Sequence, residues 1–204
     1  MSSSQILENN ETFIFDLDNV LYPEKDYLLQ VYYLFAQFME YAEQMSAGEV
    51  LAAMKLTFEK EGHDQIFEKM ARQFNIPEKY KVNFDLLMRS IRLPVKLILF
   101  DQVLLFLNNA VARGKKILLY IEGNPEMQLN KIKQTEWQGL EAHLTVYFEE
   151  ELKEESSESG LAFLATKYKL ELEKTIFIGC SESLRYKAVN AKINYLDLSK
   201  LLII

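Results

Sequence analysis

Two aspartates stand two residues apart at the end of an apolar run. Asp16 lies near the end of the stretch Thr12–Leu17, which reads as a buried strand, and Asp18 directly follows that stretch. Residues two apart in extended backbone project to the same side, so one carboxylate could attack as a nucleophile while the other moves a proton. The structural alternative is a strand that turns here, with each acid accepting from a backbone amide. The two residues alone leave both interpretations open.

The elements that must position these acids alternate between strand and helix. Helical segments are expected at Pro125–Gln134 and Gly160–Leu170. The apolar runs that predict strands are Thr12–Leu17, Lys116–Tyr120, Leu144–Phe148, Thr175–Ile178 and Ile193–Leu198. This alternation predicts an α/β fold in which helices cover both faces of a parallel sheet. In such sheets ligands bind beyond the carboxyl ends of the strands, where the two aspartates lie.

Residues 22–94 break the alternation and read as all-helical. The first helix carries apolar residues at three- and four-residue steps: Tyr27, Val31, Leu34, Phe35 and Phe38. Further helices are expected at Ala47–Glu61, Asp64–Phe74 and Lys79–Ile91. The sequence therefore predicts an α/β core of residues 1–21 and 95–204 with a helical module of residues 22–94. Its aromatic side chains, Tyr27, Tyr32, Tyr33, Phe35 and Phe38, fit either a packed core or an interface.

The longer string Phe13–Pro23, read as FIFDLDNVLYP, resembles the first motif of the haloacid dehalogenase-like (HAD) superfamily. The resemblance implies a three-layer, Rossmann-like core and a helical cap directly after this motif. It also implies that Asp16 attacks phosphorus to form an aspartyl-phosphate, and that Asp18 protonates the leaving oxygen and later activates water. Both aspartates would contribute to a Mg²⁺ site.

The second motif of the family is only partly present. Residues Gly123–Ile132 resemble the segment directly after that motif, but the family's Thr-Asn pair is replaced by Ile121 and Glu122. The hydroxyl that would bind a phosphoryl oxygen is therefore missing. If Glu122 faces the pocket next to Gly123, its charge repels a phosphate dianion. The structural interpretation of Ile121 is that it extends the apolar run of the strand.

The third motif normally supplies a lysine that offsets the charge of the phosphoryl group. The position that aligns with it here is Glu155, which reverses the charge, while Lys153 lies two residues away and could substitute. The whole segment Glu149–Ser159 is acidic and contains serine. The structural alternative is that it forms a solvated loop.

The fourth motif normally supplies the acids that hold Mg²⁺. Here it reads GCSESL, with Cys180 and Leu184 in place of the two acids and Glu182 out of register with both. Magnesium prefers hard oxygen ligands, which a thiol and a leucine do not provide. A nucleophilic role for Cys180 needs a base, and neither His63 nor His143 is placed beside it by the sequence. The favoured interpretation of Cys180 is a buried, inert thiol.

Bulk composition excludes several other classes of function. The 30 acidic and 23 basic residues give a net charge of −7, which disfavours binding to nucleic acid and to anionic membrane surfaces. A single cysteine is compatible with the reducing cytoplasm. The N-terminus lacks the pattern of a secretory signal, and we expect a protein that is not exported.

The altered motifs predict a catalytically impaired or inactive phosphatase homologue that binds a small phosphorylated metabolite or a protein partner. The alternative is a working Mg²⁺-dependent phosphomonoesterase for a nucleotide or sugar phosphate, with Asp16 as nucleophile and with Lys153 and Glu182 replacing the missing groups. A purely structural or assembly role is the third possibility.

Overall fold

The computed structural model describes residues 3–155 and 160–199, which fall into two compact units. One unit takes in the chain up to Pro23, Ile98–Pro125 and the residues from Thr135 onward. The other comprises Glu24–Leu97 and Glu126–Gln134. We call them the α/β unit and the helical unit. Among the described residues, no helix combines the length and apolar character needed to cross a membrane.

The α/β unit is built on a five-stranded sheet in which every neighbouring pair is parallel. The strand order is β5-β3-β1-β6-β7, so the strand that leads into Asp16 is central. The bounds are β1 Thr12–Phe15, β3 Lys116–Ile121, β5 Leu144–Phe148, β6 Thr175–Gly179 and β7 Asn194–Asp197. Two short strands, β2 (Leu97–Ile98) and β4 (Thr135–Glu136), pair separately. The predicted parallel α/β architecture is confirmed.

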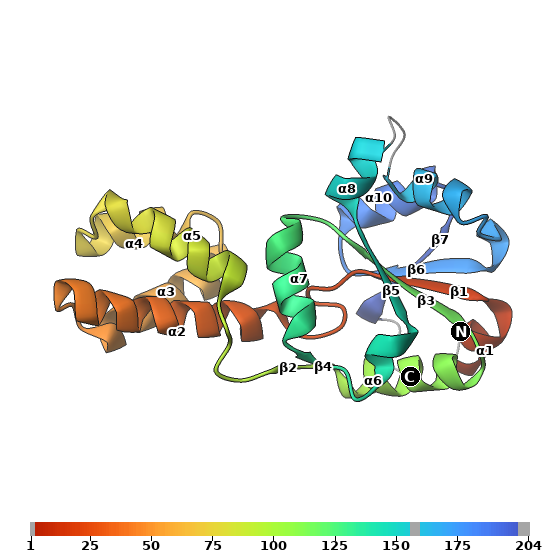
Figure 1. The fold of residues 1–204 in the computed structure, drawn as a ribbon, viewed down its shortest axis with the longest axis horizontal. Coiled ribbons are helices and arrows are strands. Elements are labelled where there is room, and N and C mark those ends of the chain that lie inside the picture. The colour runs from red at the N-terminus through yellow and green to blue at the C-terminus, as the bar shows by residue number, and fades with distance from the viewer. Residues whose placement is uncertain (1–2, 156–159, 200–204) are drawn as a thin grey trace. The chain divides into compact units, whose positions relative to one another are not determined.

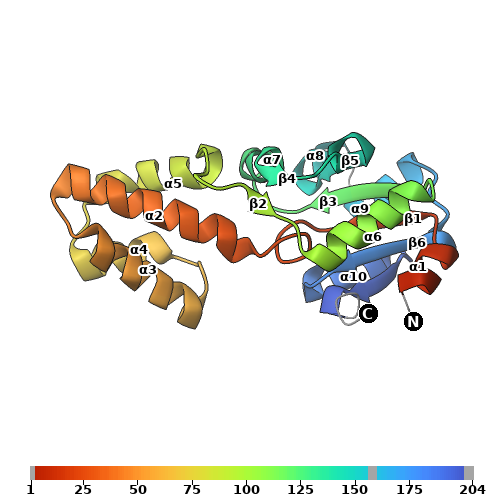
Figure 2. The ribbon, with the colours of Figure 1, turned by 90° about the horizontal axis from the view of Figure 1, so that it is seen from below.

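Helices lie on both faces of this sheet and make three layers (Figures 1 and 2). The helices of one face are α1 (Ser3–Asn9) and α6 (Asp101–Ala112), and those of the other are α8 (Glu149–Glu155), α9 (Gly160–Lys167) and α10 (Glu182–Asn190). Successive side chains of β1 point to opposite faces of the sheet, so β1 packs against the helices of both layers. The Phe13 and Phe15 rings contact Phe106 of α6, at centroid distances of 5.1 and 6.1 Å. Ile14 points the other way, into an apolar cluster with Leu161 and Leu184.

The segment Glu149–Ser159, for which a loop was the structural alternative, begins with helix α8. Residues 149–155 are helical, and residues 156–159 lie outside the described part of the chain. Glutamate, lysine and leucine are good helix formers, and acids in a first turn interact favourably with the helix dipole. Glu149 and Lys153, four residues apart, also form an ion pair of 3.1 Å. The interpretation as a loop was therefore wrong for residues 149–155.

The helical unit packs around aromatic side chains of α2 (Glu24–Glu43). The Phe35 ring contacts Phe84 and Phe67 at centroid distances of 5.1 and 5.9 Å. Tyr27 and Tyr32 are also buried, whereas Tyr33 is 45% exposed. Most of the aromatic set thus forms core. This unit also contains α3 Ala47–Glu61, α4 Ile66–Phe74, the 3₁₀ turn Glu78–Tyr80 and α5 Lys81–Ser90. The α/β unit contains two further 3₁₀ turns, Leu140–His143 and Leu172–Lys174.

Helix α7 (Pro125–Lys133) groups with the helical unit for most of its length, whereas the sequence placed it in the core. Its side chains explain the difference. Asn130 Nδ2 and Gln134 Nε2 both donate to the carbonyl oxygen of Ile91, at 2.9 and 2.8 Å. The Lys131 ammonium lies 4.9 Å from the centre of the Tyr27 ring, a cation–π contact. These contacts join residues distant in sequence, so composition alone did not reveal them.

Candidate functional site at the carboxyl edge of the sheet

Asp16 and Asp18 follow β1 in a tightly folded loop. The Asp16 carboxylate accepts the N–H of Leu17 at 2.7 Å, and the Asp18 carboxylate accepts the Tyr22 hydroxyl at 3.0 Å. The Leu21 N–H donates to the carbonyl oxygen of Leu17 at 2.9 Å and closes the turn. Both aspartates are half-buried. The amide contact of Asp16 is the kind that the turn interpretation expects, and the loop fixes both acids at the carboxyl edge of the central strand.

The end of β3 places two polar groups on one face. Ile121 is the last residue of the strand and is buried, as its interpretation as an extension of the apolar run expects. Tyr120 and Glu122, on either side of it, project to the opposite face. Gly123 then turns the chain with a φ of 90°, a left-handed conformation that glycine adopts easily. Glu122 therefore shares a face with Tyr120.

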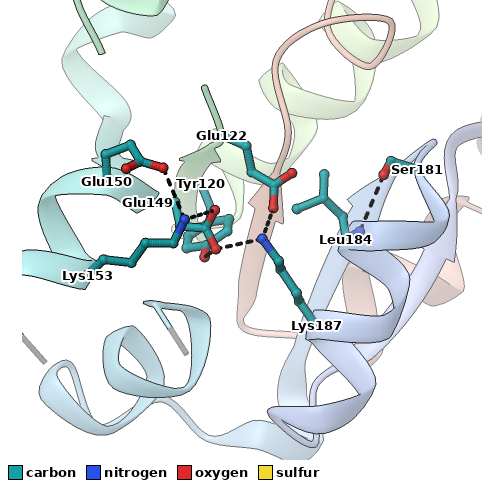
Figure 3. A network of polar contacts seen from close by, with 8 residues as sticks. All are labelled: Tyr120, Glu122, Glu149, Glu150, Lys153, Ser181, Leu184 and Lys187. Carbon is teal, nitrogen blue, oxygen red and sulfur yellow. Dashed lines mark hydrogen bonds and ion pairs between the residues drawn. The ribbon is translucent and has the colours of Figure 1, made fainter. Parts of the chain in front are cut away.

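A cluster of acids and lysines occupies that face (Figure 3). The Lys187 ammonium, from α10, donates to the carboxylates of Glu122 and Glu149, with a separation of 2.6 Å to Glu149. Lys153 donates to Glu149 and Glu150 at 3.1 and 3.0 Å. The ends of two strands and one helix are thus joined by ion pairs. We call Glu122, Glu149, Lys153 and Lys187 the charge cluster.

Glu149 is the buried centre of the charge cluster, with a side chain 6% exposed. Burial opposes its ionisation, but hydrogen bonds from Lys187, Lys153 and Tyr120 outweigh burial and hold the pKa of Glu149 below its usual value. Burial likewise opposes the charge on Lys187, and its bonds to Glu122 and Glu149 raise its pKa above the ordinary value. Both partners are therefore charged near neutral pH.

The Tyr120 hydroxyl completes the charge cluster. It donates to Glu149 Oε1 at 3.0 Å, and burial followed by the Glu149 charge raises its pKa, so it remains a neutral donor. Gly160 allows this approach because a Cβ there would lie 2.9 Å from the Tyr120 oxygen. Any side chain at Gly160 would displace the phenol.

We expect Tyr120→Phe to lower the free energy of unfolding by about 1 kcal/mol. The substitution keeps the ring but removes one of the donors to the buried Glu149 carboxylate. Urea denaturation followed by circular dichroism measures the change. Tyr186→Phe changes a residue that is 70% exposed and is the matched control, expected within about 0.5 kcal/mol of the unchanged protein. Equal stability of the two variants would contradict a structural role for the Tyr120 hydroxyl.

Sequence reasoning missed Lys187 and Glu149. Glu149 was placed in a possible loop, and Lys187 lies outside the family motifs. The spacing of Lys187 from the apolar residues of α10 was a sequence signal for its position. Lys187 follows Leu184 by three residues and directly precedes Ala188, and both of these residues are buried. Positions three and four apart share a helix face, so Lys187 borders the packed face of α10. Recognising that face required knowing that α10 is a helix, which was not predicted.

The fourth-motif residues lie where the sequence places them but do not offer a magnesium site of the usual kind. Cys180 Sγ is 3.9 Å from the carbonyl oxygen of Asp18. Leu184 is buried in the apolar cluster, and Glu182, with a side chain 86% exposed, pairs with Arg185. Within residues 3–155 and 160–199, no three or more His, Cys, Asp or Glu side chains are grouped to hold a metal ion. A soft thiol and an alkyl group do not suit Mg²⁺.

Other candidate residues from the sequence take surface or remote positions. Cys180 is exposed, so the prediction of a buried thiol was wrong, because the residue directly follows β6 at the open edge of the sheet. Glu155 is exposed and pairs with Lys167, away from the charge cluster. His143 immediately precedes β5 and so lies at the amino edge, opposite Cys180, while His63 belongs to the helical unit.

A parallel α/β sheet with acids beyond its central strand is the architecture of many Rossmann-like enzymes. No protein-family model matches the chain, and no curated protein matches it either. Solved structures do match. A HAD family hydrolase from Deinococcus radiodurans R1, determined with bound phosphate and sodium, has a TM-score of 0.57 at 15% identity and covers 95% of this chain and 88% of its own.

Two more solved structures point the same way. A HAD hydrolase from Bacillus subtilis, bound to magnesium, has a TM-score of 0.53 at 12% identity, covering 91% of this chain and 87% of its own. A haloacid dehalogenase-like hydrolase from Xanthomonas campestris has a TM-score of 0.51 at 17% identity, covering 94% of this chain and 83% of its own. The fold of this chain is that of the HAD-like hydrolases.

Proposed function

We propose that this protein is a HAD-fold homologue with impaired or no phosphatase activity, which binds a small phosphorylated metabolite or a protein partner. The observation that carries the proposal is the charge cluster. Glu122 stands where the family has a neutral residue next to its phosphate-binding hydroxyl. The Lys187 ammonium forms ion pairs with both Glu122 and Glu149.

Electrostatics argue against phosphoryl transfer at this edge. A lysine stabilises a phosphoryl group when its charge is directed at the transferred oxygens. Lys187 and Lys153 instead neutralise carboxylates that are part of the fold. Redirecting Lys187 to a ligand would weaken the hold on Glu149, whose side chain is 6% exposed. A buried carboxylate that loses a partner is strongly unfavourable.

The metal-binding positions support the same proposal. A HAD phosphatase holds Mg²⁺ with acids of the fourth motif, and here those positions are Cys180 and the buried Leu184. The Asp16–Asp18 loop still offers carboxylate and carbonyl oxygens, one of them 3.9 Å from Cys180 Sγ. We therefore assign no step of a reaction to a metal ion. The single cysteine further favours the cytoplasm as the compartment that we propose.

The alternative function is a phosphomonoesterase that uses Asp16 as nucleophile. The specific observation in its favour is that both aspartates remain at the carboxyl end of β1, in an ordered loop. The similar hydrolases solved with phosphate or with magnesium add weight to this alternative.

Hydrolysis of p-nitrophenyl phosphate by the full chain tests the proposal. With Mg²⁺ in large excess over the protein, we expect a rate at the uncatalysed background and the same rate for Asp16→Asn. Removal of one electrostatic stabiliser typically costs about 10² to 10³ in rate, and several are altered here. Turnover that needs Mg²⁺ and disappears in Asp16→Asn would establish the phosphomonoesterase instead.

A further inference from the structure

The helical unit contains a cavity of about 500 Å³ with a basic lining. Its walls come from the linker that follows α5 and from the end of α7. Three of the lining side chains are basic, Arg92, Lys96 and Lys133, and none of the described lining residues is acidic. Such a concentration of positive charge is unexpected in a chain with a net charge of −7. The volume falls in the range of small-molecule sites.

The position of these cations is not explained by helix capping alone. Lys133 ends α7, where a positive charge complements the helix dipole. Arg92 and Lys96 lie beyond Ser90, the last residue of α5, and so outside its last turn. In the part of the chain that the structure describes, neither Arg92 nor Lys133 takes part in a salt bridge. Like charges gathered around one cavity repel, and a bound anion would relieve that repulsion.

The frame of the cavity is fixed by hydrogen bonds. The carbonyl oxygen of Ile91 accepts from Asn130 and from Gln134, and Gln134 Oε1 accepts the N–H of Leu93. The Val95 N–H donates to the Gln30 side chain at 2.8 Å. The linker is therefore held in place before any ligand arrives. A site organised in advance loses less conformational entropy on binding.

We propose that this cavity binds a phosphorylated small molecule. Arg92 and Lys133 provide the charges for the phosphate group, and a guanidinium can form two parallel hydrogen bonds to phosphate oxygens. Ile91, Leu93 and Pro94 supply an apolar wall for the organic body of the ligand. The site lies wholly within the helical unit and uses neither Asp16 nor Asp18. It rests on the proposed function in one respect, because it assigns the binding of a phosphorylated metabolite to this cavity and not to the carboxyl edge of the sheet.

Titration of the ¹⁵N-labelled full chain with phenyl phosphate tests the site by amide chemical shifts. We expect saturable shifts in residues 90–96 and 130–134. Inorganic phosphate should bind more weakly because it lacks the apolar body, and benzyl alcohol should not bind. The double variant Arg92→Glu/Lys133→Glu should bind at least about tenfold more weakly, since it replaces two attractions by repulsions. Lys55→Glu/Lys60→Glu, two exposed changes on α3 that alter the net charge equally, is the matched control and should bind as the unchanged chain does.

The same titration separates this site from the carboxyl edge of the sheet. In Asp16→Asn the shifts in residues 90–96 should persist with unchanged affinity. Shifts confined to the Asp16–Asp18 loop would overturn the inference and assign phosphate binding to the carboxyl edge of the sheet, while the hydrolysis assay tests the proposed function independently. Equal binding by Arg92→Glu/Lys133→Glu and by Lys55→Glu/Lys60→Glu would also overturn it, because the cations of the cavity would then not hold the ligand.

Discussion

Leu184→Asp is expected to destabilise the protein by about 4 kcal/mol or more, and added magnesium should not restore the loss. The substitution places the family's acid at its aligned position. Here that position is 1% exposed and packs with Ile14 and Phe177. The variant loses the apolar contacts of a buried leucine and must bury a carboxyl group. For a chain of this length, the melting temperature should fall by about 8 to 16 °C.

Ser183→Asp is the matched control for this experiment. It adds the same charge one residue earlier, at an exposed position in the first turn of α10, where an acid is tolerated. We expect its melting temperature to change by at most about 2 °C, in line with a surface substitution. Recovery of the Leu184→Asp melting temperature in a large excess of MgCl₂ would mean that the acid completes a metal site, contrary to our proposal.

Lys187→Met is the second substitution with a large expected effect. It keeps the aliphatic stem but removes a charge that is bonded to Glu122 and Glu149. Because Glu149 remains buried, with Lys153 and Tyr120 as its other partners, we expect a loss of about 2 to 3 kcal/mol in the free energy of unfolding. Urea denaturation at pH 7 measures it.

The loss of stability caused by Lys187→Met should become smaller at acidic pH and at alkaline pH. The folded pKa of Glu149 is lowered from 4.5, so its stabilisation is present above pH 4.5 and fades as pH falls through the folded pKa. The folded pKa of Lys187 is raised from 10.5, so its stabilisation is present below pH 10.5 and fades as pH rises through the folded value. The difference between the unchanged chain and the variant should therefore be largest between these limits.

Lys192→Met is the control for charge alone. Lys192 is exposed and follows the end of α10, so its removal changes the net charge equally but breaks no ion pair that the structure shows. A surface change of this kind should stay within about 0.5 kcal/mol. A Lys187→Met variant as stable as Lys192→Met, or one with no dependence on pH, would show that the charge cluster contributes nothing to the fold.

The sheet was predictable because its strands are short apolar runs. Thr12–Phe15, Lys116–Ile121 and Thr175–Gly179 carry a signal that burial on both faces imposes directly on the sequence. The segment Glu149–Glu155 was interpreted as part of a possible loop, because a charged helix shows little apolar periodicity. Its helical state depends on intrinsic propensity and on packing of Leu152, which the pattern of charges conceals.

The residues of the site could be predicted where they belong to one short motif, but not where the contacts join residues that are far apart in the sequence. Asp16 and Asp18 could be assigned to the carboxyl edge because both follow a strand. The pairing of Lys187 with Glu122 joins residues 65 positions apart, and only the packing of α10 on the sheet brings them together. Exposure of Cys180 likewise depends on what covers the edge of the sheet, which a single sequence does not encode locally.

The burial of Leu184 also bears on how the chain could change over generations. A step from leucine to aspartate at this position would lower stability before any benefit from a bound cation could appear, because Cys180 would still lack a carboxylate. Selection would remove such an intermediate. Packing of this one side chain therefore opposes the return of an acid at position 184.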